Sequence, residues 1–100
     1  MWVKSFRDPG KLTPPEAAAI SSACIRLEPG SRVGEHLTAG KEELLLVLEG
    51  EATVFLGGTA TRIPAGHVAY VPPETRHDVA NRGAAQLLYV YVTARLVAKP

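Results

Sequence analysis

Cysteine, net charge and long apolar runs are scarce in this sequence, and each scarcity excludes a class of protein. Its one cysteine, Cys24, rules out a disulfide within the chain, so no oxidising compartment is required. A formal net charge of +1 provides no basic field that would attract nucleic acid or an anionic membrane surface. The apolar run Leu44 to Leu48 has five residues, whereas a membrane-spanning helix needs about twenty. We therefore expect a cytoplasmic protein with neither nucleic-acid nor membrane partners.

The length and composition are those of one folded domain. The 100 residues are 46% hydrophobic and 21% charged, a balance that folded proteins have and disordered tails lack. A chain of this length is too short for two ordinary domains, and it buries roughly two-thirds of its unfolded surface, which suffices for a stable core. We expect a single domain over residues 1–100.

Short strand-like runs separated by turn residues dominate the chain. The pair Gly57-Gly58 has the conformational freedom that a hairpin turn between two strands requires. Helix is indicated only weakly, at residues 15–19, which lead into a better strand pattern. The even spacing of short strands predicts an all-β sandwich or barrel of about eight to ten strands. The expected strands are residues 20–27, 32–37, 43–49, 51–56, 59–63, 67–71, 76–81 and 84–97.

Two of these strands are apolar on both faces. In residues 44–48 and 87–92, hydrophobic side chains occupy odd and even positions alike, whereas a strand with one hydrated face alternates. A small barrel has little chain of its own with which to cover an outer face. A second copy of the chain is the simplest cover, so we expect a homodimer.

Side chains of the types that bind metals stand where strands meet turns. His36 and Thr38 share one face of their strand because side chains alternate. Glu43 opens the next strand, and His77 follows the rigid Pro72-Pro73 turn. Two histidines and one carboxylate form a donor set that leaves positions open on a metal, as at catalytic zinc and non-haem iron sites. By composition alone the same three residues could be surface or hydrogen-bonded side chains, and their number does not decide between the two interpretations.

The spacing of these residues resembles the two motifs of the cupin family. The first motif has the form G-x5-H-x-H-x3,4-E-x6-G, and residues 30–50 fit it at every place but one. The second has the form G-x5-P-x-G-x2-H-x3-N. Residues 58–66 match its first half and residues 77–81 its second half, with the longer gap that is common in small cupins. The motifs span residues 30–81, which leaves 1–29 for N-terminal strands and a linker and 84–97 for a closing strand.

The resemblance implies a jelly-roll barrel, or double-stranded β-helix, with one divalent metal ion at its mouth. The family's metal ligands carry over to His36, Glu43 and His77, and the ion would be Fe, Zn, Ni or Mn. Thr38 stands where most metal-binding members have a second histidine. Because a threonine hydroxyl is a poor ligand for zinc or iron, we expect Thr38 instead to hydrogen-bond a metal-bound water or a substrate oxygen.

The resemblance admits two functions. A metalloenzyme would act on a small polar molecule that chelates the metal, such as a hydroxy acid, a sugar derivative or a catechol-like compound, by oxygenase, isomerase or lyase chemistry. Its candidate catalytic residues are Glu43, Thr38 and Tyr70. The alternative is a non-catalytic small-molecule binding or sensor domain, with or without a metal. We expect the enzyme, because no DNA-binding segment accompanies the barrel.

Four other residues are weaker candidates for the site. Glu42 falls on the opposite face from Glu43 and is expected to be solvated, and His67 is expected to be an exposed turn residue. Tyr89 and Tyr91 are expected to pack in the strands, or to supply a hydrogen-bond donor if they point into the barrel.

Overall fold

Strands account for all the regular structure that the computed structural model describes, which covers residues 1–97. Within that range there are nine strands and no helix, so the all-β prediction is confirmed. The part of the chain that the structure describes accordingly has no helix long and apolar enough to cross a membrane. The strands are β1 (Gly10–Lys11), β2 (Ile20–Leu27), β3 (His36–Leu37), β4 (Lys41–Glu49), β5 (Glu51–Leu56), β6 (Thr59–Pro64), β7 (Val68–Val71), β8 (Arg76–Ala80) and β9 (Leu87–Arg95).

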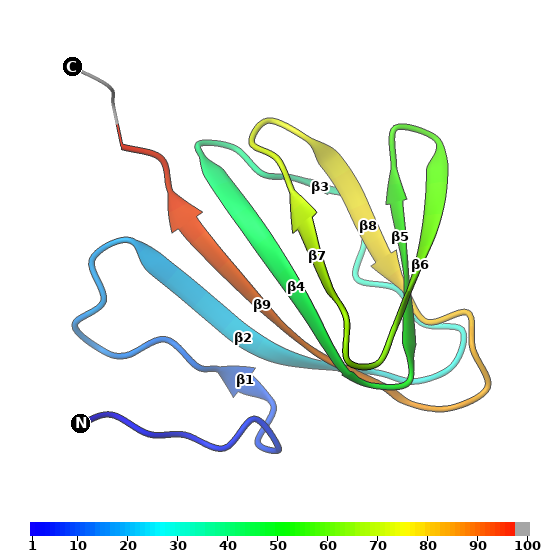
Figure 1. Ribbon diagram of the computed structural model, residues 1–100, viewed down its shortest axis with the longest axis horizontal. Coiled ribbons are helices and arrows are strands. Elements are labelled where there is room, and N and C mark those ends of the chain that lie inside the picture. Colours follow the sequence, from blue (N-terminus) through cyan, green and yellow to red (C-terminus); the bar gives the residue numbers. More distant parts are fainter. Residues whose placement is uncertain (98–100) are drawn as a thin grey trace.

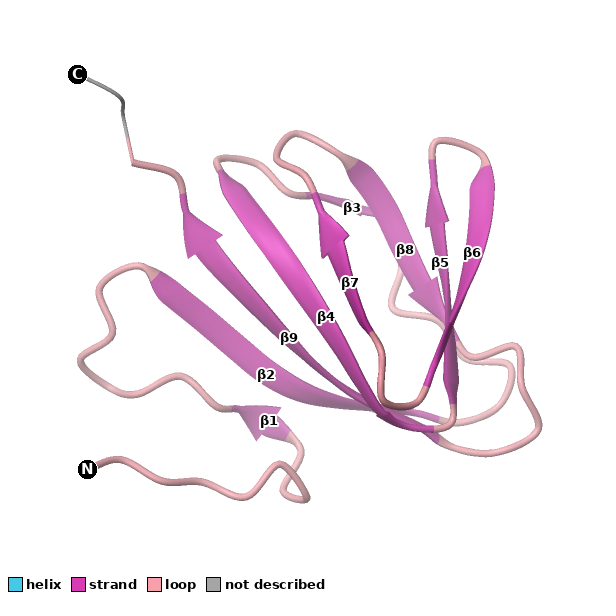
Figure 2. Cartoon of the chain, viewed as in Figure 1, coloured by secondary structure: helices cyan, strands magenta, loops and turns pink. Residues whose placement is uncertain are grey.

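The strands form two antiparallel sheets that face each other (Figures 1 and 2). One sheet has five strands in the order β1-β2-β9-β4-β7, and the other has four in the order β3-β8-β5-β6. The sheets converge at the end where β4 turns into β5, and they separate toward the end that holds β3 and the turn between β7 and β8 (Figure 1). The jelly-roll barrel that the sequence predicts therefore has a closed end and an open end.

The hydrophobic core lies between the sheets and follows from the alternation of side chains along each strand. On β4 the inward Leu45 and Val47 are buried, while the outward Leu44 is exposed. Val54 and Val79 join the same cluster from the facing sheet. Burying a side chain of this size stabilises the fold by roughly 1.5–3 kcal/mol.

The closed end of the barrel requires a glycine. Gly50 links β4 to β5 with a φ of +75°, in the left-handed region that residues with a Cβ disfavour. A Cβ at this position would lie 2.5 Å from the carbonyl oxygen of Gln86, closer than real Cβ atoms come to a backbone oxygen. This glycine of the first motif is therefore a packing requirement, since the chain entering β9 passes directly against the turn.

Apart from β3 and β9, the predicted strands agree with the structure to within two residues at each end. β9 begins at Leu87 rather than at residue 84, because residues 83–85 form a bend, and it ends at Arg95 rather than at residue 97. The sequence predicts a strand over residues 32–37, but β3 contains only two residues. Gly34 has a φ of +109° and donates its N–H group to a side chain, which interrupts the ladder and leaves an isolated bridge between Arg32 and Ala80. β1 lies in the segment 1–29 where N-terminal strands were expected, but its position was not predicted, because two residues carry no periodic pattern. Residues 15–19, the weak helix signal, form turns and bends.

The outer face of the five-stranded sheet is apolar, and the chain's own N-terminal segment covers part of it. Cys24 and Leu88 are each 1% exposed, and the Cys24 thiol donates to the carbonyl oxygen of Phe6. Burial raises the pKa of this thiol above its ordinary value. Leu44 and Val68, on the same face, remain 42% and 59% exposed. The chain therefore covers one part of this face by itself and leaves another part open.

Candidate metal centre

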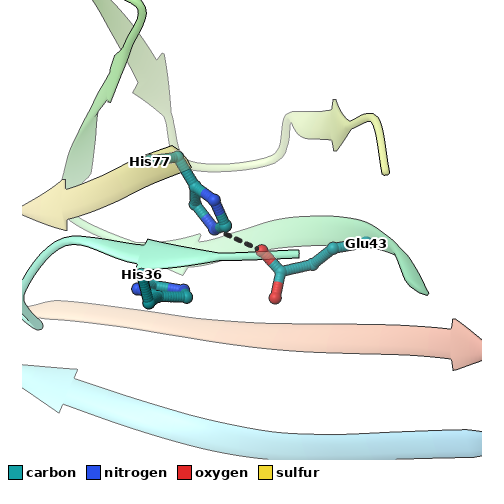
Figure 3. Close-up of side chains that lie close together, drawn as sticks. All are labelled: His36, Glu43 and His77. Carbon is teal, nitrogen blue, oxygen red and sulfur yellow. Dashed lines mark hydrogen bonds and ion pairs between the residues drawn. The ribbon is translucent and has the colours of Figure 1, made fainter. Parts of the chain in front are cut away.

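His36, Glu43 and His77 meet at the open end of the barrel, each on a different strand (Figure 3). One donor atom from each lies within 4.8 Å of the other two, so the structure brings together the three residues that the sequence predicts as ligands. The pairing of β3 with β8 places His36 directly opposite His77, and their ring centroids are 4.1 Å apart. Glu43 approaches both rings from the five-stranded sheet.

Backbone carbonyl groups fix the orientation of both imidazole rings. His36 Nδ1 lies 2.8 Å from the oxygen of Gly34, and His77 Nδ1 lies 3.2 Å from the oxygen of Thr75. A carbonyl oxygen only accepts hydrogen bonds, so the proton of each ring belongs on Nδ1. In the neutral ring Nε2 then has a free lone pair, which is the form in which histidine binds a metal.

The contact between His77 and Glu43 is favourable only with a positive charge between the two side chains. His77 Nε2 lies 3.0 Å from Glu43 Oε2, and the two side chains are 0% and 7% exposed. With Nδ1 protonated, a neutral His77 would place two acceptor atoms face to face in a buried site, which is unfavourable. A proton on Nε2 or a metal ion between the two atoms removes the conflict. Two imidazoles and one carboxylate fit a divalent transition metal with open positions.

A cavity of about 550 Å³ opens beside the three residues. Leu45 and Val79 contribute apolar wall, and Tyr89 and Tyr91 both line it, which is the inward orientation that the sequence left open for them. Burial, together with the nearby charge of Glu43, raises the pKa of Tyr89 well above its ordinary value. The Tyr89 hydroxyl therefore keeps its proton at neutral pH and is available to donate a hydrogen bond.

Asp78 organises the loop that carries His36, and sequence analysis missed it. Its carboxylate is buried, accepts the N–H of Gly34 at 2.8 Å through Oδ1, and pairs with the Arg32 guanidinium at 2.5 Å through Oδ2. Gly34 in turn accepts the hydrogen bond from His36, so Asp78 fixes His36 through one intervening residue. The available signal was a carboxylate directly after His77, in a strand whose last two residues, Val79 and Ala80, are apolar.

The Thr38 hydroxyl has a different role from the one expected. Thr38 is 4% exposed and lines the cavity, but its Oγ1 donates to the carbonyl oxygen of Pro72 at 2.6 Å and accepts the N–H of Thr75 at 3.1 Å. These bonds join the loop between β3 and β4 to the turn between β7 and β8. The hydroxyl proton is thus committed to the backbone rather than to a metal-bound water or a substrate.

Tyr70 lies on the wrong side of the sheet for the catalytic role considered for it. It pairs with the outward Leu44, is 53% exposed, and donates its hydroxyl to Glu42 Oε1 at 3.0 Å. That hydrogen bond raises the pKa of Tyr70. Glu42 is on the face opposite Glu43, as expected, and His67 is an exposed residue after the turn at Ala65. Tyr70 points outward because side chains alternate along β7 and its neighbour Val71 takes the inward position.

Comparison with known proteins identifies the family. A profile described as Cupin domain matches residues 23–93. The chain belongs to the cupin family. A curated relative of this cupin, the oxalate-binding protein of Thermotoga maritima, is 33% identical over 70 residues, which cover 70% of this chain and 58% of that protein. The match therefore spans less than two-thirds of the relative's own length.

Solved structures show the same cupin fold. A Cupin 2 conserved barrel domain protein from Salinispora arenicola superposes with a TM-score of 0.79 at 24% identity, covering 94% of this chain and 88% of that one. A protein described as a predicted oxalate decarboxylase from Thermotoga maritima superposes with a TM-score of 0.76 at 24% identity, covering 96% and 100%.

Proposed function

We propose that this cupin binds one divalent metal ion through His36, Glu43 and His77 and uses it to bind and transform a small polar molecule that chelates the ion. The observation that carries the proposal is the 3.0 Å approach of His77 Nε2 to Glu43 Oε2, two buried acceptor atoms with His36 beside them. Iron, zinc, nickel and manganese are the candidate ions, since imidazole and carboxylate groups bind ions of this kind.

The names given to two matches, both from Thermotoga maritima, suggest the chemical class of the ligand. One is called an oxalate-binding protein and the other a predicted oxalate decarboxylase. Oxalate chelates a metal through two carboxylate oxygens, and a three-ligand site leaves room for such a pair. We therefore propose a small chelator that bears a carboxylate, without assigning the reaction to the oxygenase, isomerase or lyase type.

The residues around the cavity have separable tasks in this proposal. A bound metal ion would supply a Lewis acid that polarises oxygen atoms of the ligand. Leu45 and Val79 form the apolar wall that excludes water from the bound molecule, and the protonated Tyr89 hydroxyl donates to a ligand oxygen. Glu43 acts as a metal ligand, because its burial and its contact with His77 restrict its movement.

One observation favours the second candidate function, a non-catalytic binding or sensor domain. The hydroxyl groups of Thr38 and Tyr70, two of the three candidate catalytic residues, are hydrogen-bonded elsewhere. The cavity then has fewer groups that exchange protons with a substrate, and a barrel so equipped can hold its ligand without changing it.

The first test is to remove the metal. The protein purified without added metal should contain a divalent ion by elemental analysis, and a chelator should lower its melting temperature. A metal at a hundredfold excess over its dissociation constant stabilises the folded chain by about 2.7 kcal/mol. For a chain of this size that corresponds to a shift on the order of 10 °C. His77→Ala should abolish the chelator effect, because it removes a ligand.

His67→Ala is the matched control for that experiment. His67 is exposed and its ring contacts the carbonyl oxygen of Ala65, so the variant should retain the full chelator effect. A wild-type melting temperature that changes with neither chelator nor added metal would contradict the metal site. Adding oxalate to the metal-loaded protein separates the two functions: consumption of oxalate supports the enzyme, and binding without consumption supports the sensor.

We also propose that two copies associate through the outer face of the five-stranded sheet. Leu44, Val68 and Tyr70 leave part of this face apolar and exposed, and exposed apolar patches of several hundred Å² usually mark interaction surfaces. The cytoplasmic location and the absence of nucleic-acid and membrane partners stay predictions from composition.

A further inference from the structure

A second hollow, of about 450 Å³, adjoins the cavity of the metal centre and has three cationic side chains in its lining. Lys41 precedes Glu43 by two residues on the same inward face of β4, and Arg95 lies opposite Lys41 in the register of β4 and β9. Lys11 also lines this hollow. We call the hollow the cationic annex and define it by Lys11, Lys41 and Arg95.

The annex and the cavity of the metal centre share a wall. Ser21, Lys41 and Thr93 line both hollows. The rise per residue of a strand places Lys41 about 7 Å from Glu43 along β4. The lysine side chain is long and flexible, so its ammonium group can lie closer to Glu43 than this backbone separation. A molecule held at the metal by one end can therefore present its other end to Lys41.

The charges of the annex have no carboxylate partners within residues 1–97. None of its three cations belongs to an ion pair there, and no acidic residue lines it. Arg95 donates to the backbone oxygen of Ala18, which holds its side chain beside the annex. Four arginines elsewhere are paired: Arg7 with Glu49, Arg32 with Asp78, Arg62 with Glu51 and Arg76 with Glu35.

The metal cavity has a different charge from the annex. Its two carboxylates are Glu43, which belongs to the metal centre, and Glu35, which pairs with Arg76 at 3.6 Å. The site as a whole therefore has a metal-binding end and a cationic end. Such a polarity matches a ligand with two distinct groups, one that chelates and one that carries negative charge.

We propose that the annex binds an anionic group of the same molecule that chelates the metal, an inference that rests on the proposed function. The ligand class is then a small hydroxy acid with a second anionic group, carboxylate or phosphate, roughly two to four bonds from its chelating end. Oxalate alone does not fill this site, because its two carboxylates are bonded to each other and both are engaged at the metal.

Two matched ligands test the annex in nickel-loaded protein by calorimetry. L-malate and L-2-hydroxybutyrate share a chelating end, and malate has a carboxylate in place of a methyl group. Malate should bind about tenfold more tightly, the gain typical of a hydrogen bond to a charged group. Lys41→Gln and Arg95→Gln should each bring the two affinities to within about twofold. Arg95 lines the annex and not the metal cavity, so Arg95→Gln should also preserve the affinity for 2-hydroxybutyrate.

Arg62→Gln is the control, because it removes the same charge from an exposed site on the other sheet and should keep the tenfold preference. A parallel pair, D-glycerate and 3-phospho-D-glycerate, distinguishes phosphate from carboxylate as the preferred anion. Equal affinities within both pairs, or a preference unchanged in Lys41→Gln, would overturn the annex and leave the metal site standing. Failure of wild type to bind any of the four candidate ions, iron, zinc, nickel and manganese, would overturn the proposed function and the annex together.

Discussion

The two faces of the five-stranded sheet are built from the same strands but differ in composition and cover. On the inner face of β4, Leu45 and Val47 belong to the core, and toward the open end they give way to Glu43 and Lys41. On the outer face, Leu44 stays exposed and apolar near that same end. Because side chains alternate along a strand, one run of nine residues supplies a site for chemistry on one face and a surface for association on the other.

The largest expected effect separates the covered and the open parts of the outer face. Leu88→Ala should lower the free energy of unfolding by about 2–5 kcal/mol, because Leu88 is 1% exposed and its truncation leaves a cavity. Leu44→Ala, on the same face but 42% exposed, should cost within about 0.5 kcal/mol in a monomer. Urea denaturation at low protein concentration measures both. Equal losses would mean that Leu88 is no better covered than Leu44 in solution.

The next prediction concerns metal binding on the inner face of the sheet. Asp78→Asn should weaken metal binding by about 10- to 100-fold, because Asp78 holds Gly34, which holds His36. Calorimetric titration with zinc measures the affinity, and Arg62→Gln provides a surface control whose affinity should match wild type. An Asp78→Asn protein with unaltered affinity would show that the loop orients His36 without this carboxylate.

The smallest effect concerns association through the outer face. Leu44→Lys should weaken dimerisation by about tenfold, since it places a charge on each side of an apolar interface. Sedimentation equilibrium over a range of micromolar concentrations gives the dissociation constant. Thr61→Lys, at an exposed position of the other sheet, should behave as wild type. Wild type that sediments as a monomer throughout would rule out the dimer proposed here.

The sequence predicted most of the fold because strand periodicity and turn residues are local signals. The predicted strand over residues 20–27 is β2, and that over residues 51–56 is β5. The pairing of residues distant in sequence was supplied by the family motifs, which placed His36, Glu43 and His77 together. The hydrogen bond between Gly34 and the buried Asp78 joins residues far apart in the sequence, and no local pattern indicated it.

The details of the site were harder to predict, because they depend on which face a side chain occupies and on what it meets there. Tyr70 and Tyr89 are both tyrosines in strands of the five-stranded sheet, but Tyr70 points outward to Glu42 and Tyr89 lines the cavity. The sequence indicated no role for Lys41 beyond a turn, since an isolated lysine carries no motif. Its position became informative only when the register placed Arg95 opposite it.

The hydrogen bonds of Thr38 also constrain how this cupin can acquire a fourth ligand in evolution. A histidine at position 38 would lose the contacts of Oγ1 with Pro72 and Thr75, each worth about 0.5–1.5 kcal/mol. A lineage that substitutes position 38 first would therefore pass through a less stable barrel before the new ligand compensates. A lineage that first re-anchors the turn at residues 72–75 avoids that intermediate, so the order of the two changes decides which path selection can follow.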